Sequence, residues 1–259
     1  MASRIAAAGF EVVAWARRPA SLDPFRAPGV GSAADPRALA DAVDLVCVCV
    51  RSDDDVEMVC AGDSGVLAGL RPRSTLLIHS TVAPATVLSL AERAAAVGAD
   101  LLDAPVSGGA AAASAGRLLT MIGGDALVLE RCRPVLATHS DRIVLVGDVG
   151  SGQIAKLLNN GLFAAGVALA RNALAAGRRM GLDRAALGDA LSAGSARSFA
   201  LDVVAGAGGD DLPAAARDLL AKDVALLEAL LRDDRANPLV TAARWVLEGG
   251  VEPPPSERT

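Results

Sequence analysis

The chain has 259 residues, of which 52% are hydrophobic and 2% are aromatic, and its formal net charge is -5. This length supplies one large domain or two smaller ones, each with its own hydrophobic core. The acidic balance and the scarcity of aromatic rings argue against nucleic acid or an anionic membrane as the main partner.

Cysteine usage and hydropathy favour a protein of the reducing cytoplasm. The chain has four cysteines: Cys47, Cys49, Cys60 and Cys132. Their spacing fits neither a disulfide framework nor a metal site, so free and buried thiols are predicted. No stretch reaches the roughly 18 apolar residues that cross a bilayer, and the N-terminus lacks the layout of a signal peptide. We therefore expect a soluble cytoplasmic protein.

The first half of the chain alternates between helical and extended patterns. Helices are predicted at 1–8, 34–42, 53–60, 84–97 and 126–137, and strands at 11–16, 44–50, 74–79, 99–103, 118–122 and 143–146. Strands that alternate with helices of this length indicate βαβ units and a mainly parallel sheet.

The strand patterns end near Gly152, and the rest of the chain is helical. Helices are predicted at 152–180, 183–192, 198–205, 214–232 and 238–248, joined by short turns with Gly, Pro or Asp. This change of pattern predicts two domains, one over residues 1–150 and one over 151–259.

The beginning of the chain departs from the usual layout of a doubly wound domain. Such a domain normally starts with a strand and a glycine-rich turn that lead into the first helix. Here Met1 to Arg4 reads as the middle of that helix. We therefore expect the natural chain to begin about a dozen and a half residues further upstream, with the missing strand and loop.

The long predicted helix at 152–180 carries three polar residues on one stripe. Gln153, Lys156 and Asn160 are spaced i, i+3 and i+7 among apolar residues, so they share one helix face. A lysine at this place could lie in a ligand-binding cleft. A lone lysine on a core helix more often extends its amine to solvent. The stripe alone leaves both readings open.

Four motifs follow one another in a characteristic order. They are STVAP at 80–84, DAPVSGG at 103–109, GRLLTMIGG at 116–124 and GQIAKLLNN at 152–160. Together with a later Lys222-Asp223, this order resembles the β-hydroxyacid dehydrogenase family, which includes 3-hydroxyisobutyrate dehydrogenases and semialdehyde reductases. The resemblance implies an α/β fold: a Rossmann-type doubly wound parallel sheet, here without its first strand, followed by an all-α C-terminal domain. It also implies hydride transfer between a nicotinamide and a small 3-hydroxy acid or its semialdehyde.

The resemblance assigns substrate-side roles to residues of two motifs. Lys156 matches the catalytic lysine, the general acid/base. Ser107, Gly108 and Gly109 match the loop that receives the substrate carboxylate, and backbone N–H groups of such a loop can bind an anion. Asn160 is expected to hydrogen-bond the substrate. Taken alone, a Ser-Gly-Gly after a strand is more often an ordinary turn.

Six residues are assigned to the cofactor: Arg17, Arg18, Val50, Arg51, Thr81 and Lys222. Arginine after the first visible strand suits the 2′-phosphate of NADP, whereas an acidic residue would favour NAD. NADP is therefore the predicted cofactor, with NAD possible. By resemblance, Thr81 lies near the nicotinamide, Lys222 closes over the cofactor, and Val50-Arg51 replaces a Leu-Pro of the adenosine-side loop. Read alone, Ser80-Thr81 is a helix N-cap.

Two other functions compete with this interpretation. A catalytically impaired relative could serve as an oligomeric binding module, which intact Ser107, Lys156 and Asn160 disfavour. An imine reductase of the same architecture is disfavoured by Lys156. Under each of these interpretations, the Ala-rich face at 161–177 is expected to pair with a second subunit in a homodimer or homotetramer, as the resemblance implies.

Overall fold

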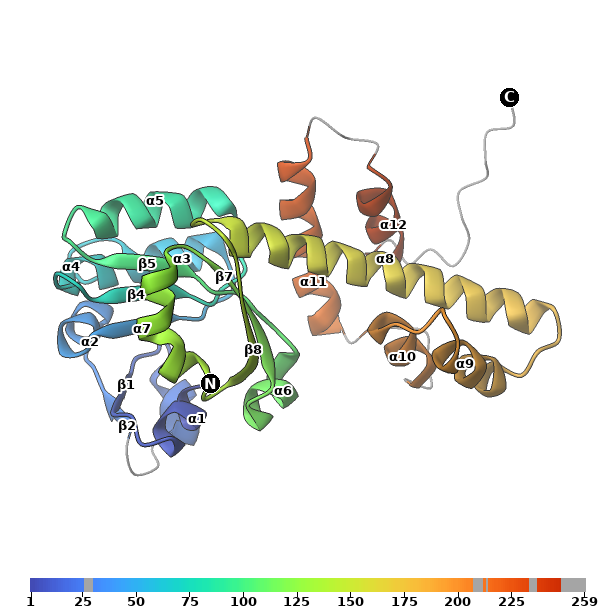
Figure 1. Ribbon diagram of the computed structural model, residues 1–259, viewed down its shortest axis with the longest axis horizontal. Helices are drawn as coiled ribbons and strands as arrows, with labels where there is room; N and C mark the ends of the chain where they lie inside the picture. The colour runs from blue at the N-terminus through green and yellow to red at the C-terminus, as the bar shows by residue number, and fades with distance from the viewer. Residues whose placement is uncertain (26–29, 207–211, 213, 233–236, 248–259) are drawn as a thin grey trace. The chain divides into compact units, whose positions relative to one another are not determined.

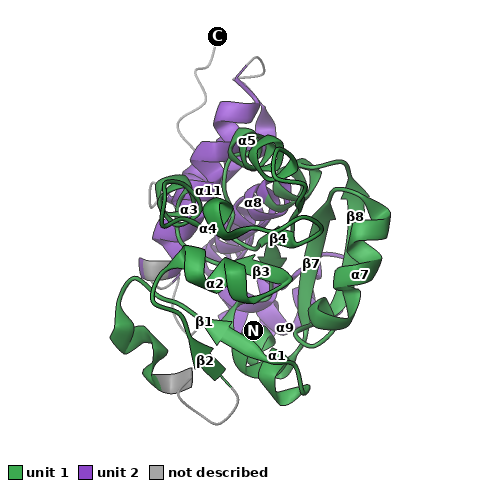
Figure 2. Cartoon of the chain, turned by 90° about the vertical axis from the view of Figure 1, so that its left-hand side faces the viewer, with its two compact units in different colours: residues 1–156 green, residues 157–259 purple. Residues whose placement is uncertain are grey.

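The computed structural model describes residues 1–25, 30–206, 212, 214–232 and 237–247. The chain divides into two compact units, Met1–Lys156 and Leu157–Thr259 (Figure 2). The boundary lies inside a continuous helix, α8 (Ser151–Arg179; Figure 1).

The first unit is built on two β-sheets. A two-stranded parallel sheet joins β1 (Val12–Ala14) to β2 (Val30–Ser32). The larger sheet contains β3 (Leu45–Val48), β4 (Thr75–Ile78), β5 (Asp100–Asp103), β6 (Val106–Ser107), β7 (Leu118–Gly123) and β8 (Ser140–Gly147). Strands β3, β4 and β5 run parallel in register, and β7 is antiparallel to both β5 and β6. Parallel strands of this kind end at one common edge, where open α/β sheets bind ligands.

Helices cover both faces of the larger sheet. They are α2 (Pro36–Ala42), α3 (Asp53–Cys60), α4 (Val66–Gly69), α5 (Pro84–Ala95) and α7 (Ala126–Leu136), with α1 (Ala2–Ala7), a 3-10 helix (Pro19–Phe25) and α6 (Gly109–Ala115) elsewhere in the unit. Leu76 and Ile78 of β4 pack in one core cluster with residues of α3 and α5, including Val87. Leu77 points to the opposite face and packs with Leu129 of α7. The alternation of side chains along a strand thus builds a helix–sheet–helix sandwich (Figure 1).

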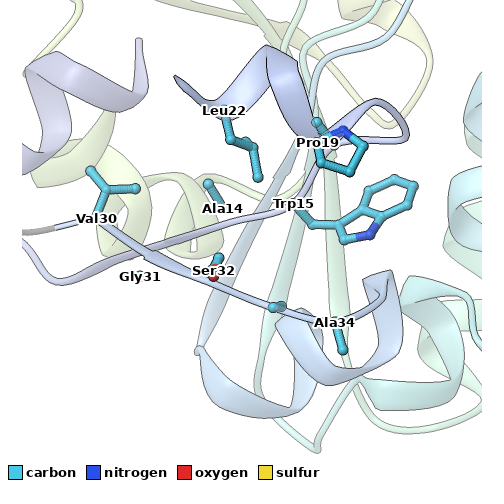
Figure 3. Close-up of a pocket in the computed structure, with 10 residues that line it drawn as sticks. Ala14, Trp15, Pro19, Leu22, Val30, Gly31, Ser32 and Ala34 are labelled. Atoms are coloured by element: carbon cyan, nitrogen blue, oxygen red, sulfur yellow. The ribbon is translucent and has the colours of Figure 1, made fainter. Parts of the chain in front are cut away.

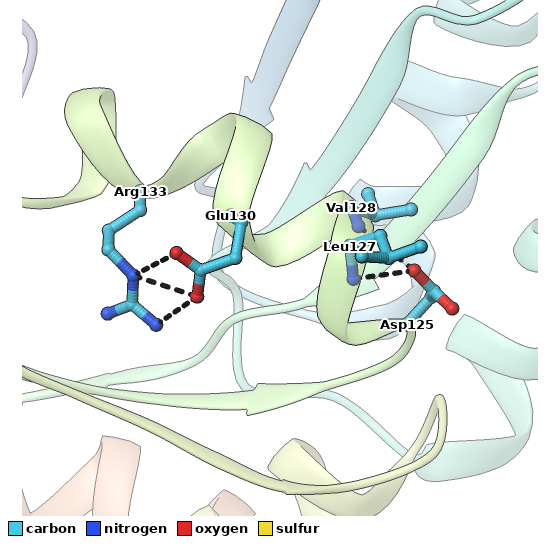
Figure 4. A network of polar contacts seen from close by, with 5 residues as sticks. All are labelled: Asp125, Leu127, Val128, Glu130 and Arg133. Atoms are coloured by element: carbon cyan, nitrogen blue, oxygen red, sulfur yellow. Dashed lines mark hydrogen bonds and ion pairs between the residues drawn. The ribbon is translucent and has the colours of Figure 1, made fainter.

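Helix α7 shows how local chemistry fixes an element of this unit (Figure 4). The carboxylate of Asp125 accepts the N–H groups of Leu127 at 2.8 Å and Val128 at 3.0 Å. An N-cap of this kind stabilises a helix by about 1 kcal/mol, because the first N–H groups have no partner within the helix. Further along, Arg133 donates to Glu130 at 2.7 Å, one turn apart.

The second unit is helical, as predicted. It contains most of α8 together with α9 (Arg184–Ala193), α10 (Phe199–Gly206), α11 (Ala214–Leu230) and α12 (Pro238–Leu247). Ala164 and Ala168 of α8 are fully buried in one cluster with Leu201, Val224 and Ala243. The small side chains of α8 therefore pack against the unit's own helices. Ala164 and Ala168 therefore leave no surface for a partner, and the pairing of the face at 161–177 with a second subunit stays a prediction.

The structure confirms the predicted α/β class and corrects several local predictions. Helix 53–60 has the predicted bounds. Strands β2 and β6 and helices α4 and α6 were not predicted, because each is short and β2, α4 and α6 contain glycine. Helix α6 lies between Gly108 and Gly116, both at positive φ.

Two of the four cysteines differ from the prediction. Cys60 and Cys132 are buried, whereas Cys47 and Cys49 are exposed. Cys47 and Cys49 alternate with the buried Val46 and Val48, so the two cysteines share the one face of β3, the last strand of the larger sheet on its side, that is open to solvent. In the described residues, no helix combines the length and apolar character needed to cross a membrane.

Candidate active site

The first turns of α8 carry the lysine that the sequence singled out. Lys156 is 8% exposed and Gln153 is fully buried, so both lie on the inner face of the helix. Their burial excludes the reading in which the lysine extends into bulk solvent. Asn160, one turn further along the same helix, is half-buried.

Gln153 connects α8 to the loop of the STVAP motif. Its side-chain oxygen Oε1 accepts the N–H of Val82 at 3.0 Å, and its Nε2 donates to the carbonyl of Ser80 at 2.9 Å. The amide thereby satisfies two backbone groups that would otherwise be buried without partners. These contacts give Gln153 a structural role between the helix and the loop.

Asp103 connects the same helix to the end of β5. This carboxylate is fully buried and accepts the N–H groups of Gly150 at 2.7 Å and Gln153 at 2.8 Å. Burial raises the pKa of Asp103, and the hydrogen bonds from Gly150 and Gln153 oppose that rise. No role was predicted for this aspartate, although it opens the DAPVSGG motif.

The STVAP loop is held by neighbours on both sides. Ser80 accepts the N–H of Val50 at 2.8 Å through its hydroxyl, which ties the loop after β3 to the loop after β4. Helix α5 is capped by Asp53, which accepts the Ala83 N–H at 2.9 Å and the Thr86 hydroxyl at 2.6 Å. The prediction of Ser80-Thr81 as the N-cap of this helix is therefore wrong: the N-cap residue is Ala83, and the capping carboxylate comes from α3.

The DAPVSGG loop turns sharply after its serine. Ser107 ends β6 and pairs with Leu119 of β7, and Gly108 and Gly109 follow with φ of 126° and 70°. L-residues avoid these angles, so glycine is required here. Both glycines are exposed, which leaves their backbone accessible at the surface of the unit.

A pocket of about 420 Å³ lies at the ends of β1 and β2 (Figure 3). Its lining includes Trp15, Pro19, Leu22 and Ser32. A recess beyond the carboxyl ends of parallel strands is where α/β sheets bind nucleotides.

Two of the three arginines assigned to the cofactor, Arg17 and Arg18, lie in the turn beside this pocket, between Ala16 and Pro19 of its lining. Arg17 donates to Asp55 of α3 at 2.9 Å while its own side chain is 62% exposed. Arg51, in the loop after β3, is also exposed. The sequence did not predict the Arg17–Asp55 ion pair.

In the second unit, Asn160 belongs to a polar cluster with Lys222 and Asp223. Asn160 donates to Asp223 at 2.6 Å, and Lys222 forms an ion pair with the same carboxylate at 2.8 Å. The Asp223 side chain is 1% exposed. Asn159 donates to Asn160 at 3.1 Å, so the amide of Asn160 is oriented from two sides. Asp223 adjoins Lys222 in sequence, and that adjacency was the available signal for its role.

Two family models together match nearly the whole described chain. Residues 1–147 match the NAD binding domain of 6-phosphogluconate dehydrogenase. Residues 150–247 match the model described as NAD-binding of NADP-dependent 3-hydroxyisobutyrate dehydrogenase.

Curated relatives and solved structures agree with these models. A 3-hydroxyisobutyrate dehydrogenase of Pseudomonas aeruginosa is 36% identical over 78% of this chain and 68% of the relative. A 2-(hydroxymethyl)glutarate dehydrogenase of Eubacterium barkeri is 32% identical over 96% of this chain and 84% of the relative. A Mycobacterium tuberculosis 3-hydroxyisobutyrate dehydrogenase structure with L-serine superposes with a TM-score of 0.86 at 26% identity, covering 96% of this chain and 88% of that one.

A structure of Psf3 in complex with NADP+ and 2-OPP superposes with a TM-score of 0.84 at 28% identity, covering 95% of this chain and 88% of that one. The order of motifs, the two-unit fold and these matches agree. The chain belongs to the β-hydroxyacid dehydrogenase family of NAD(P)-dependent oxidoreductases, with 3-hydroxyisobutyrate dehydrogenase-like relatives.

Proposed function

We propose that this protein transfers a hydride between NADP and a small 3-hydroxy acid or its semialdehyde, with Lys156 as general acid/base. The observation that carries the proposal is the position of Lys156, which is buried on α8. The first turn of that helix is hydrogen-bonded to the STVAP loop and to Asp103, the first residue of the DAPVSGG motif. A proton-transferring group needs a fixed position and restricted access to water.

The first unit fits a dinucleotide. The pocket at the ends of β1 and β2 has room for part of a nucleotide, and Arg17 and Arg18 adjoin it with the charge that suits a 2′-phosphate. Val50 and Arg51 lie in the loop after β3, next to the STVAP loop that contains Thr81. We assign these residues to the cofactor, together with Lys222. The bound nicotinamide would accept or supply the hydride.

The substrate is a small carboxylate in this proposal. The relatives above are named for 3-hydroxyisobutyrate and 2-(hydroxymethyl)glutarate, both acids that carry an alcohol. Ser107, with the backbone of Gly108 and Gly109, would bind the carboxylate, because a hydroxyl and nearby N–H groups can share its charge. Asn160 would hydrogen-bond the hydroxyl or carbonyl oxygen.

Lys156 accepts or donates the proton that accompanies hydride transfer. Oxidation of an alcohol releases the hydroxyl proton as the carbinol hydride leaves, and the neutral amine accepts that proton. In the reverse direction, the ammonium form donates a proton to the carbonyl oxygen. Lysine holds a proton on a single nitrogen and can perform both steps.

We also propose a homodimer or homotetramer. Ala164 and Ala168 of α8 pack within the chain, but Leu162 and Leu169 of the same helix are 67% and 61% exposed. They are seven residues apart and therefore lie on nearly the same face. We place the contact with a second subunit on this face, because exposed apolar side chains gathered on one face mark interaction sites more often than scattered ones do.

The decisive experiment compares turnover of wild-type and Lys156→Ala protein. The assay uses a panel of semialdehydes with NADPH and NADH, and the reverse reaction with 3-hydroxy acids. Loss of a general acid/base should lower kcat by a factor on the order of 10²–10⁴. An unchanged kcat in Lys156→Ala would reject the assignment. Absence of turnover of any panel member by the wild type, with NADPH still bound, would favour the binding-module alternative.

A further inference from the structure

We propose that Asp103 and Gln153 are positioning residues that set the register of α8 and thereby the place of the Lys156 amine. This inference rests on the proposed function, because it gives the two residues a role that acts through Lys156. It concerns the first unit alone, where all the contacts lie. Its basis is that the first turn of α8 is bound at once to the STVAP loop and to the end of β5.

Asp103 fixes the helix along its axis. Its Oδ1 accepts the Gly150 N–H at 2.7 Å and its Oδ2 accepts the Gln153 N–H at 2.8 Å. These N–H groups belong to the start of the helix and have no partner within it. A carboxylate at a helix N-terminus is also favoured by the helix dipole. Both oxygens of one buried side chain are thus used to hold one helix end.

Glycine allows this close approach. A Cβ at position 152 would lie 2.7 Å from the Asp103 Oδ2 and 2.7 Å from the Met121 carbonyl oxygen. The first turn of α8 therefore packs directly on the carboxylate and on the backbone of β7, without an intervening side chain. Contact of this kind leaves little freedom for the helix to slide.

Gln153 fixes the rotation of the helix. Its side chain uses both ends of the amide, accepting from Val82 and donating to Ser80. A side-chain amide carries a donor and an acceptor at one planar end, so it can satisfy the Val82 N–H and the Ser80 carbonyl at once. Lys156 follows three residues later on the same face. A shift of the register by one residue would rotate that face by about 100° and remove the amine from its position.

Two substitutions test the contacts with minimal change of shape. In Asp103→Asn, either orientation of the amide places an NH2 against one of the two N–H donors, so one hydrogen bond becomes a repulsion. In Gln153→Glu, a carboxylate oxygen replaces the NH2 that donates to the Ser80 carbonyl. A matched control is Asp100→Asn, because Asp100 lies on the same strand but is partly exposed, with 41% of its side chain accessible, and pairs with Arg131 at the surface.

The measurement is kcat, KM and the pH dependence of kcat for the full-length protein, corrected for the folded fraction seen by circular dichroism. A displacement of about 1 Å in a catalytic group can cost on the order of 10² in rate. We expect Asp103→Asn and Gln153→Glu to lower kcat by roughly 10- to 100-fold, to shift the pH profile, and to leave KM for NADPH within about twofold. Asp100→Asn should match the wild type.

A double-substitution series separates positioning from general loss of stability. If the two residues act through Lys156, Asp103→Asn should cause no further loss of kcat in a Lys156→Ala background. Full additivity of the two losses would overturn the inference, as would wild-type kcat and pH profile in both single variants while Lys156→Ala is impaired. An active Lys156→Ala protein would instead overturn the proposed function, so the two failures are distinguishable.

Discussion

Asn160 on α8 and Asp223 on α11 are 63 residues apart in sequence and joined by a 2.6 Å hydrogen bond. The same carboxylate holds Lys222 at 2.8 Å. Asn160 and Lys222, which the proposed function assigns to the substrate and the cofactor, therefore share one buried carboxylate in the second unit. Asp223 orients both side chains.

Replacing that acid should affect stability and substrate binding together. In Asp223→Asn, Lys222 loses its ion-pair partner and the amide can oppose the Asn160 NH2. Hydrogen bonds to a charged group contribute about 1.5–3 kcal/mol, so we expect a loss of free energy of unfolding in that range. KM for the hydroxy acid should rise as well. Urea denaturation and steady-state kinetics measure both effects. Asp218→Asn, an exposed position on the same helix, should change neither, and an equal effect there would contradict the prediction.

Cofactor preference should depend on the turn after β1. Arg18→Ala is expected to weaken NADPH binding about 10-fold, since a charge-assisted contact with a phosphate is lost, while NADH binding stays the same. Fluorescence titration with both nucleotides measures this. Arg71→Ala is the control, because Arg71 is likewise an exposed arginine but has no assigned role with the cofactor. Equal weakening of NADPH and NADH by Arg18→Ala would argue against 2′-phosphate recognition.

Two buried histidines make folding stability sensitive to acid. His79 and His139 lie edge to face with ring centroids 5.5 Å apart. Burial lowers the pKa of His139 to about 4, with the charge of His79 and the N-terminal amine acting in the same direction. Burial likewise lowers the pKa of His79.

The sign of the pH effect follows from these directions. Below about pH 6.5 the unfolded chain binds a proton at His139 that the folded chain does not bind until about pH 4. Stability should therefore fall as pH is lowered between these values, by up to about 3 kcal/mol from His139 alone. Urea midpoints at pH 7.5 and pH 5 measure the loss, and His139→Gln should reduce the difference. A difference as large as that of the wild type would show that other groups cause it.

The exposed leucines of α8 should govern assembly. Leu162→Asp with Leu169→Asp places two charges where an apolar contact is proposed, and burial of unpaired charges is strongly unfavourable. We expect light scattering to show a smaller mass than for the wild type. Leu219→Asp, at a 52% exposed leucine of α11, tests whether any new surface charge has this effect. An unchanged mass in the double variant would exclude this face as the interface.

The sequence by itself determined the order of the longer helices and strands, though not the short β2, β6, α4 and α6. It also determined the change to an all-helical second half and the motifs that mark the family. These features are local: period and capping residues depend on neighbours a few positions away. The same local signal placed Gln153, Lys156 and Asn160 on one helix face.

The tertiary structure decided which partners these residues have. Asp103 meets Gln153 across 50 residues, Gln153 meets Val82 across 71, and Asn160 meets Asp223 across 63. It also decided that Cys47 and Cys49 are exposed on an end strand and that Ala164, Ala168 and Ala170 of α8 pack in the chain's own core. Burial and hydrogen-bond partners arise from packing between distant segments, and no local pattern in the sequence encodes which segments meet.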